Sequence, residues 1–469
     1  MAARRERMTM SIIGRNAGAL AATITILGTM AAGPAAAQLH IAAEARVTLL
    51  ARAYNAAGQQ LFGQLATSPG NIVFSPYSVG TAMSMLISGA RGDTAAEMMR
   101  TMSIRMAADA IDAANAEMLS ILNGYDQSTA STVCPPRSTV SAGNCESRPG
   151  GDLMNQCQPG FRLVGNRCVA PGMAPASARF VAANALVLGK RGVQTSADYV
   201  SALQTRYAAE VFKDASLDDL NGWVARKTEG KIGRMLDQID PDWAVTILNA
   251  VYFKARWASV FDPRLTKNEA FNLTRSQQAD VALMNQTGSF SLVSRGGYRA
   301  LRLNYQVPEL GLVVVMPDDI EGVGAVASRL GTNELTELFA ALRDGKAKKP
   351  VALTLPRFKA EYKADLAAPL RQAGIHKAFD ANSADFSGMT GRPAGDGRLH
   401  VDQIVHRAVL EAGEESTEAA AATAVTVRSA AIAPSPTFAT FRVDHPFLFY
   451  LVDDTTGAIL FQGRVADPR

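Results

Sequence analysis

The sequence predicts an α+β protein with large, mostly antiparallel sheets. Three observations support this prediction. Long apolar stretches such as residues 245–253 have the length and composition of strands buried on both faces of a sheet. Amphipathic helical patterns are concentrated before residue 123. Helices and strands then follow one another without strict alternation, which is typical of the α+β class.

Taken in order, the first helix is expected at residues 41–66, where Val47, Leu50, Tyr54 and Leu61 recur at helical spacing. Further helices are expected at 81–88, twice within 93–122, at 217–237 and at 364–374. Strands are expected at 71–75, 181–188, 245–253, 301–305, 312–316 and 352–358, and a closing hairpin at 447–452 and 458–465 around the turn 453–457.

The composition is that of a soluble globular protein with a large core: 48% of the 469 residues are hydrophobic and 19% are charged. The net charge of +4 comes from scattered charges rather than a basic run with interleaved aromatics. Nucleic acid is therefore not expected as a partner.

Residues 1–37 have the plan of a signal peptide. Four arginines precede an apolar stretch at 16–33, and Ala35 to Ala37 offer a small-residue cleavage site. A membrane anchor is the alternative, but the apolar stretch is short and rich in Ala, Gly and Thr. We expect cleavage, a secreted or extracytoplasmic location, and a single domain at 38–469 with no membrane association.

Residues 124–177 differ from the rest of that domain, since they are rich in Pro, Gly, Ser and Asn. All four cysteines lie there: Cys134, Cys145, Cys157 and Cys168. In an exported chain they are expected to form two disulfides, with three pairings open. A metal site is disfavoured because the spacings are ten or more residues and no histidine is near. The segment is predicted to be a disulfide-stapled insertion.

Residues 414–431, EESTEAAAATAVTVRSAA, admit two interpretations. Four consecutive alanines favour a short surface helix or a linker. Read with period two, Thr417, Ala419, Ala421 and Thr423 form one small, uncharged face, while Glu418 and Arg428 fall on the other. That alternation is typical of a strand with one buried face. The segment is therefore a candidate for a loop in one state and a sheet strand in another.

Four stretches, taken together, resemble the serpin family. They are residues 406–425 (HRAVLEAGEESTEAAAATAV), 71–78 (NIVFSPYS), 248–257 (LNAVYFKARW), and 444–449 (DHPFLF) with the ending 460–465 (LFQGRV). They occur in the family's order and span nearly the whole chain after the first forty residues. The resemblance implies a serpin-like α+β fold with about eight or nine helices and an exposed reactive loop, interrupted by the cysteine-containing insertion.

The resemblance also implies roles for particular residues. The hinge of the loop would comprise Glu414, Ser416, Thr417, Glu418, Ala419, Ala420, Ala421 and Ala422. The shutter, where the main sheet opens, would comprise Ser75, Ser78, Asn249 and His406. The breach, at the top of the sheet, would comprise Trp257, Arg357 and Glu414, with Glu414 paired to Arg357.

An inhibitory serpin presents about the seventeenth residue of the loop to a protease, and counting from Glu414 this residue is Ala430, followed by Ala431. A small bait residue fits the shallow pocket of an elastase-like protease. The alternative bond is Arg428–Ser429, which suits a trypsin-like protease. Residues 432–442 are longer than is usual for the family, so a bond further along the chain also stays open.

The expected function is suicide inhibition of a serine or cysteine protease by a monomer without cofactor or metal. A hydrolase is disfavoured because Gly-x-Ser-x-Gly, Ser-x-x-Lys and His-Glu-x-x-His are all absent from the sequence. A non-inhibitory serpin with a binding or structural role stays open because Ser416 stands where inhibitory members carry Gly. Backbone angles that Gly adopts freely cost Ser about 1 kcal/mol.

Overall fold

The computed structural model describes residues 34–126, 138–141, 144–147, 162–164, 167–169, 178–189, 194–240, 243–393, 399–415 and 438–469. The chain divides into two units, Met1–Ala42 and Ala43–Arg469. Apart from the beginning of helix α1, everything described below belongs to the second unit.

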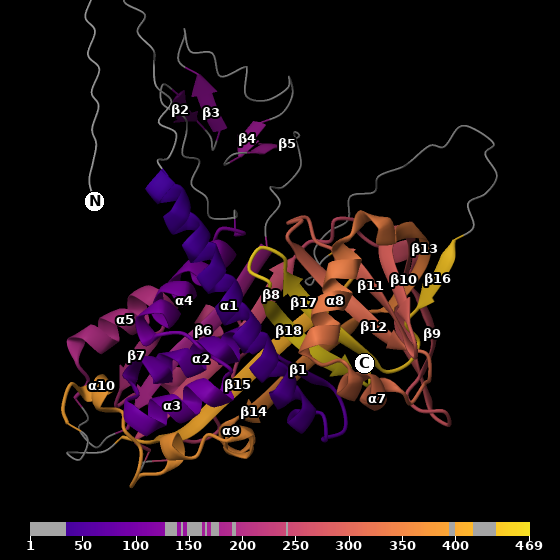
Figure 1. Ribbon diagram of the computed structural model, residues 1–469. Coiled ribbons are helices and arrows are strands. Elements are labelled where there is room, and N and C mark those ends of the chain that lie inside the picture. Colours follow the sequence, from indigo (N-terminus) through magenta and orange to yellow (C-terminus); the bar gives the residue numbers. More distant parts are fainter. Residues whose placement is uncertain are drawn as a thin grey trace, which may run out of the picture. The chain divides into compact units, whose positions relative to one another are not determined.

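Ten α-helices occur in the described residues (Figure 1). They are α1 (Pro34–Leu65), α2 (Pro76–Gly89), α3 (Gly92–Thr101), α4 (Ala108–Asn123), α5 (Ala197–Tyr207), α6 (Leu217–Lys227), α7 (Val323–Arg329), α8 (Thr332–Arg343), α9 (Ala367–Ala373) and α10 (Ser387–Thr390). Local capping defines several helix starts. Ser75 accepts the Ser78 N–H ahead of Pro76, and Ser216 forms a capping box with Asp219.

The strands form two large sheets. The nine-stranded sheet comprises β1 (Ile72–Phe74), β18 (Ile459–Val465), β17 (Phe447–Asp453), β12 (Leu310–Pro317), β11 (Tyr298–Asn304), β10 (Gln278–Arg295), β13 (Lys348–Pro356) and β16 (Ala439–Arg442) in that order, with β9 (Lys267–Asn272) also paired to β10. The five-stranded sheet has the order β14 (Phe358–Asp365), β15 (Val401–Ala412), β8 (Val245–Ala255), β6 (Ala178–Leu188) and β7 (Glu210–Lys213). The predicted α+β class with large, mostly antiparallel sheets is confirmed.

Two small hairpins fall within the predicted insertion. They are β2 (Ser138–Ser141) with β3 (Asn144–Ser147), and β4 (Arg162–Val164) with β5 (Arg167–Val169). Cys145 and Cys168 lie on β3 and β5. Cys134 and Cys157 lie outside the described residues, so the pairing of the cysteines stays a prediction.

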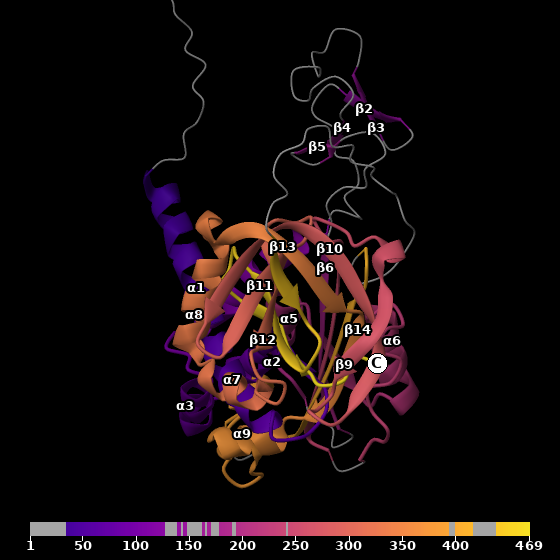
Figure 2. The same ribbon diagram turned by 90° about the vertical axis from the view of Figure 1, so that its right-hand side faces the viewer.

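The five-stranded sheet is covered on both faces. On one face Leu248 and Val405 pack with Trp223 of α6. On the other, Ile247 and Ile404 join the main core. Figure 2 shows α6 on the flank of this sheet. Strand β8 at the centre is therefore buried at ten of its 11 residues, as its apolar composition predicts, and β15 beside it is buried at eight of its 12.

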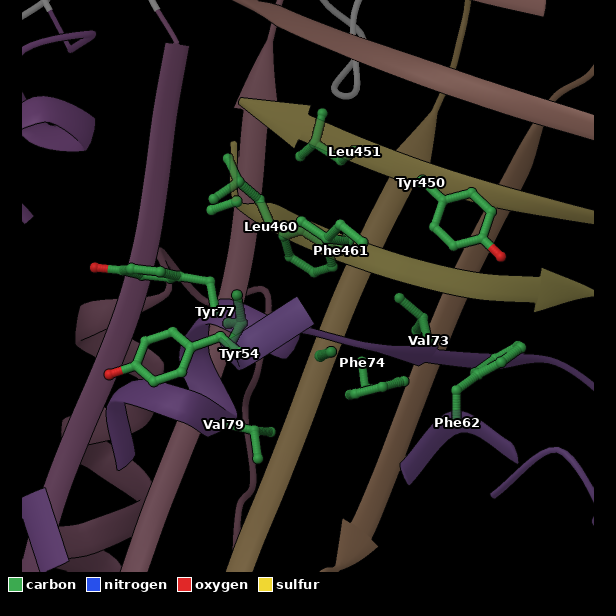
Figure 3. Close-up of a cluster of buried hydrophobic side chains, with 14 of the residues drawn as sticks. Tyr54, Phe62, Val73, Phe74, Tyr77, Val79, Tyr450, Leu451, Leu460 and Phe461 are labelled. Atoms are coloured by element: carbon green, nitrogen blue, oxygen red, sulfur yellow. The ribbon is translucent and has the colours of Figure 1, made fainter. Parts of the chain in front are cut away.

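The main core lies between α1, α2 and the closing hairpin (Figure 3). Phe74 of β1 stacks on Phe62 of α1 with ring centroids 6.1 Å apart. Phe180 contacts both Tyr77 and Phe461 edge-on, at 5.4 and 5.9 Å. These contacts join the first helices to the last strands of the chain.

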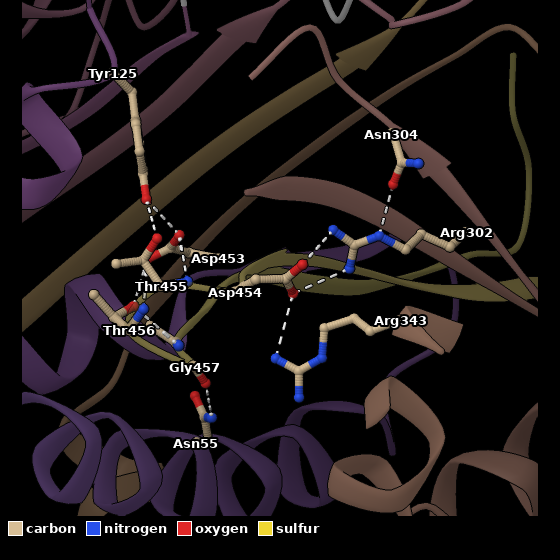
Figure 4. Close-up of polar contacts among 11 residues, drawn as sticks. Asn55, Tyr125, Arg302, Asn304, Arg343, Asp453, Asp454, Thr455, Thr456 and Gly457 are labelled. Atoms are coloured by element: carbon tan, nitrogen blue, oxygen red, sulfur yellow. Dashed lines mark hydrogen bonds and ion pairs between the residues drawn. The ribbon is translucent and has the colours of Figure 1, made fainter. Parts of the chain in front are cut away.

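The ends of the predicted insertion meet at the β17–β18 turn. The Ala178 N–H donates to the Tyr125 carbonyl at 3.0 Å, and Arg179 Nε lies 3.6 Å from a carboxylate oxygen of Asp126. The Tyr125 hydroxyl bonds to Asp453 Oδ1 and Thr455 Oγ1, both at 2.8 Å (Figure 4). The two ends of the predicted insertion therefore lie next to each other.

Three predicted elements need correction. Helix α6 ends at Lys227 rather than 237, because Glu229 and Gly230 take left-handed backbone angles with φ 52° and 78°. The strand predicted at 352–358 spans two strands, β13 and β14, on either side of Arg357. The helix predicted at 364–374 is shorter, α9, since residues 364 and 365 belong to β14.

Candidate functional site

The candidate site is the centre of the five-stranded sheet, where β8 and β15 lie side by side and run parallel. Their ladder extends from Val401↔Val245 to Val409↔Tyr252. Because the two strands are parallel, both end at the same edge of the sheet. The chain leaves β15 at that edge as residues 413–415 and enters the predicted loop.

Residues 413–415 are held by the segment that follows β8. The Trp257 indole donates to the Gly413 carbonyl at 2.8 Å, and the Trp257 N–H donates to the Glu415 carbonyl at 3.1 Å. The Phe261 N–H donates to the Glu414 carbonyl at 2.8 Å. Three successive carbonyls at the start of the loop are thus satisfied by one segment.

The side chain of Glu414 is buried and doubly bonded. It forms an ion pair with Arg357, which lies between β13 and β14, and accepts a hydrogen bond from Thr266 Oγ1 at 2.9 Å. Burial by itself raises the pKa of Glu414, but the hydrogen bonds from Arg357 and Thr266 outweigh it, and the pKa is lowered. The carboxylate is therefore ionised at neutral pH.

Trp257 is fixed by stacking. Its ring lies 4.5 Å from that of Tyr305 at an interplanar angle of 15°, and the two residues also form an isolated bridge. Both side chains are buried. The predicted breach residues Trp257, Arg357 and Glu414 therefore lie together.

The predicted shutter residues also lie together, inside the sheet. His406 of β15 and Asn249 of β8 are partners in the ladder, and His406 Nδ1 lies 2.5 Å from Asn249 Oδ1. The Asn249 amide donates to Ser78 Oγ at 2.6 Å and to Asn184 Oδ1 of β6 at 2.5 Å. One amide thus joins three strands and helix α2.

This network fixes the tautomer of His406. The Ser75 N–H donates to His406 Nε2 at 3.4 Å, so Nε2 is the acceptor and Nδ1 carries the hydrogen that Asn249 accepts. Burial lowers the pKa of His406 to about 3. The imidazole is therefore neutral.

The remaining predicted site residues lie outside the described part of the chain. They are the hinge residues Ser416, Thr417, Glu418, Ala419, Ala420, Ala421 and Ala422, and the candidate reactive bonds Ala430–Ala431 and Arg428–Ser429. The same holds for most of the predicted signal peptide, since the described residues begin at Pro34.

Sequence reasoning missed several partners of the predicted residues. Thr266 binds Glu414, Asn184 binds Asn249, and Tyr305 stacks on Trp257. Arg256 lies with its guanidinium 3.8 Å from the Glu415 carboxylate. An unusual polar residue in an apolar strand, such as Asn184 in residues 181–188, was the one available signal.

No group of three or more His, Cys, Asp and Glu side chains in the described ranges is placed to hold a metal ion. The helices that the structure describes include none that is both long and apolar enough to cross a membrane.

Comparisons with known proteins agree with this architecture. The serpin (serine protease inhibitor) family model matches residues 52–138 and 160–468, and the gap between them falls within the predicted insertion. Iripin-2 of Ixodes ricinus is 30% identical over 433 residues, which cover 89% of this chain and 93% of the relative. The leukocyte elastase inhibitor of Homo sapiens is 30% identical over 421 residues, covering 85% and 93%.

Among solved structures, human thyroxine-binding globulin complexed with thyroxine has the same fold, with a TM-score of 0.71 and 23% identity over 90% of this chain and 99% of that chain. The family match covers most of the sequence, and the relatives align over most of their own length. The chain belongs to the serpin family.

Proposed function

We propose that this serpin is a suicide inhibitor of serine proteases, or of cysteine proteases, and not an enzyme. The observation that carries the proposal is the parallel β8–β15 pair at the centre of the sheet, from whose β15 end the candidate loop departs. A chain that turns back from this edge runs antiparallel to both strands. It can therefore become a new central strand without changing the direction of either neighbour.

The exchange of strands releases free energy. Insertion replaces one parallel ladder with two antiparallel ones, and antiparallel pairing is slightly more stable per residue. Strand β15 has 12 residues and β8 has 11, so a strand of similar length fits between them. At about 0.5–1.5 kcal/mol net per hydrogen bond, such a strand gains on the order of 10 kcal/mol. The intact form is then kinetically trapped.

The proposed reaction sequence uses this energy. The loop is attacked by the protease nucleophile, a covalent acyl-enzyme forms, and the peptide after the cleaved bond is freed. The hinge then inserts and carries the acylated protease with it before water can complete hydrolysis. On insertion, Thr417, Ala419 and Ala421 of the proposed hinge, and Thr423 directly after it, would face the interior of the sheet, where small uncharged side chains are needed.

We assign the breach and the shutter to control of this insertion. Breach contacts hold the first loop residues at the edge where insertion begins. The shutter bond between His406 and Asn249 crosses the two strands that must separate. Both must open for a strand to enter.

We assign the reactive bond to Ala430–Ala431, whose small side chains suit an elastase-like target. Relatives named leukocyte elastase inhibitor are consistent with such a target. Arg428–Ser429 is the alternative bond and implies a trypsin-like target. Cutting there shortens the inserting arm by two residues, about 6–7 Å of strand, and weakens the displacement of the protease.

We also propose that the protein is exported with removal of residues 1–37. Two disulfides would then form within residues 124–177. The disulfides depend on the export, because an oxidising compartment is needed to form them. Peptide mapping of non-reduced protein purified from the medium or periplasm tests both. Four free thiols would contradict the disulfides, and a retained Met1 would contradict the cleavage.

A non-inhibitory binding protein is the second candidate, and one observation favours it. A pocket of about 190 Å³ lies between α1, α8 and the β17–β18 turn, lined by Arg52, Asn55, Phe339 and Arg343 among others. Ligand pockets usually measure about 300–1,000 Å³. This pocket is smaller than that range, so the inhibitor remains the better-supported function.

Thermal unfolding tests the proposed mechanism. The intact protein and the protein nicked in the loop are compared by differential scanning calorimetry. If the loop inserts, the nicked form unfolds at a much higher temperature. Equal unfolding temperatures would contradict the mechanism and leave the binding-protein alternative.

A further inference from the structure

Asp402 occupies an irregular position at the start of β15. The β8–β15 ladder pairs Val401 with Val245 and then Gln403 with Thr246, so Asp402 is the extra residue of a bulge. Its carboxylate Oδ2 accepts the N–H of Ala244 at 2.7 Å and the N–H of Val245 at 3.0 Å. At the bulge, where the backbone ladder is interrupted, the Asp402 side chain therefore supplies the hydrogen bonds between β15 and the start of β8.

The second carboxylate oxygen of Asp402 is also bonded. His400 Nε2 lies 3.1 Å from Asp402 Oδ1. The other nitrogen of His400 is buried and has no hydrogen-bond partner within the described residues. Asp402 therefore orients the imidazole, and the two side chains form one unit, which we call the foot contact: Asp402, His400, and the N–H groups of Ala244 and Val245.

The foot contact lies at the end of the strand pair opposite the loop. Asp402 is the second of the 12 residues of β15, whereas the chain leaves β15 after Ala412. At the rise of a strand, Ala412 and Asp402 are about 33 Å apart along the sheet. A loop that inserts from the breach reaches the foot contact last.

Insertion to full length cannot leave the foot contact in place. Neighbouring strands lie about 4.7–4.9 Å apart, so an inserted strand separates β8 from β15 by about twice that spacing. The carboxylate of Asp402 then cannot reach the N–H groups of Ala244 and Val245. Ladder bonds lost by β8 and β15 are remade to the new strand, but the bonds to this carboxylate are not. The contact stabilises the intact form alone.

We propose that Asp402 is a positioning residue that opposes the last part of loop insertion. It holds the foot of the β8–β15 pair closed until the rest of the strand has paired. This inference rests on the proposed function, because it concerns the same insertion. It adds a second point of control, remote from the breach and the shutter.

The chain offers a matched control in Asp365 of β14. Its carboxylate Oδ1 also accepts two backbone N–H groups, that of Ala367 at 3.0 Å and that of Ile404 at 3.3 Å. The Ile404 bond joins β14 to β15, and these two strands stay together when a strand enters between β15 and β8. Loss of the Asp365 carboxylate should therefore affect intact and cleaved protein alike.

The experiment compares unfolding midpoints of intact and loop-cleaved protein for wild type, Asp402→Ala and Asp365→Ala, since alanine removes the acceptor oxygens that asparagine would keep. We expect Asp402→Ala to lower the midpoint of the intact form by about 2–4 °C and to leave the cleaved form within about 1 °C of wild type. Asp365→Ala should lower both midpoints equally. His400→Gln, which keeps the two backbone bonds, should give a smaller shift with the same pattern and serves if Asp402→Ala does not fold.

Each contrary outcome has a distinct meaning. If cleavage stabilises wild type but Asp402→Ala and His400→Gln lower both forms equally, or neither, the foot contact plays no part in insertion and the inference is overturned. If cleavage does not stabilise wild type, the loop does not insert, which overturns the proposed function and this inference with it.

Discussion

His406 of β15 faces Asn249 of β8 across the parallel ladder, and its Nδ1 lies 2.5 Å from the Asn249 side-chain oxygen. The two residues pair both through their backbones and through their side chains. That bond needs a hydrogen on Nδ1, and Nε2 must stay unprotonated to accept the Ser75 N–H, so the closed sheet depends on the protonation state of one buried histidine.

Acidification should weaken the intact form through His406. Burial lowers the pKa of His406 to about 3, whereas an unfolded histidine has a pKa near 6.5. The unfolded state therefore binds the proton first, so this stability is present above pH 6.5 and is lost as pH falls toward 3. From pH 7.5 to 5.5 the loss is about 1.4 kcal/mol.

Denaturant unfolding of wild type and His406→Gln at several pH values measures this effect. The variant should be less stable at pH 7.5 and should show a pH dependence weaker by that amount. Identical pH slopes in the two proteins would show that His406 is not the responsible group.

The ion pair between Glu414 and Arg357 should slow spontaneous conversion of the intact form to latent or polymeric protein. Arg357 is half-exposed, so we expect a coupling of only about 0.5–1 kcal/mol, a two- to fivefold change in rate. A double-mutant cycle with Glu414→Gln and Arg357→Gln measures it during incubation at raised temperature.

A control cycle is available on the two strands next to this ion pair. Lys359 and Glu411 pair at 3.2 Å across β14 and β15, which do not separate on insertion. That cycle should show no coupling in the conversion rate. Additive effects of Glu414→Gln and Arg357→Gln would remove the role proposed for the breach pair.

Thr417→Arg should abolish inhibition and leave the intact fold unchanged. On the proposed alternation its side chain enters the sheet interior, where an unpaired charge costs several kcal/mol. Glu418→Arg is the matched control, because the same charge then lies on the outward face. Complex formation by Thr417→Arg at the wild-type rate would contradict the proposed hinge.

Residues 127–177 should be dispensable for folding. The Tyr125 carbonyl and the Ala178 N–H are already hydrogen-bonded at 3.0 Å, so a short Gly-rich turn can join Asp126 to Ala178. We expect the unfolding midpoint of this deletion to stay within about 2 °C of wild type, because shortening a closed loop changes its entropy little. Calorimetry and circular dichroism of the deletion variant check this.

Tyr125→Phe in the full chain is the companion variant. It removes the hydroxyl bonds to Asp453 and Thr455, and it should cost about 1–3 kcal/mol because the buried carboxylate loses a donor. A deletion variant that fails to fold while Tyr125→Phe folds would show that the segment is an integral part of the core.

Much of the fold can be predicted from the sequence because several strands are unusually apolar. Residues 245–253 and 447–452 have no plausible environment except a buried sheet, and both are strands. In contrast, β10 was missed although it has 18 residues, since polar side chains and Gly288 interrupt its alternation. Its conformation follows from pairing with β9, β11 and β13, which no local pattern reveals.

The sequence likewise predicts some residues of the candidate site and not others. Resemblance to the family named His406, Asn249, Trp257 and Glu414, which the structure places in two clusters. The sequence does not identify Thr266 and Asp402, because short polar residues are common. Their roles depend on the groups that the fold places beside them, the Glu414 carboxylate for Thr266 and two backbone N–H groups for Asp402. The sequence predicts helix α6 too long, because the pattern of side chains there does not indicate the left-handed backbone angles at Glu229.

The proposal as a whole is tested most directly by mixing the protein with an elastase-like and with a trypsin-like protease and measuring the products by denaturing electrophoresis and mass spectrometry. We predict a complex with the elastase-like protease that survives SDS, together with a released C-terminal peptide that begins at Ala431. A peptide beginning at Ser429 would move the reactive bond to Arg428–Ser429. Complete cleavage of the loop with no SDS-stable complex, by either protease, would contradict the claim that this serpin traps its target.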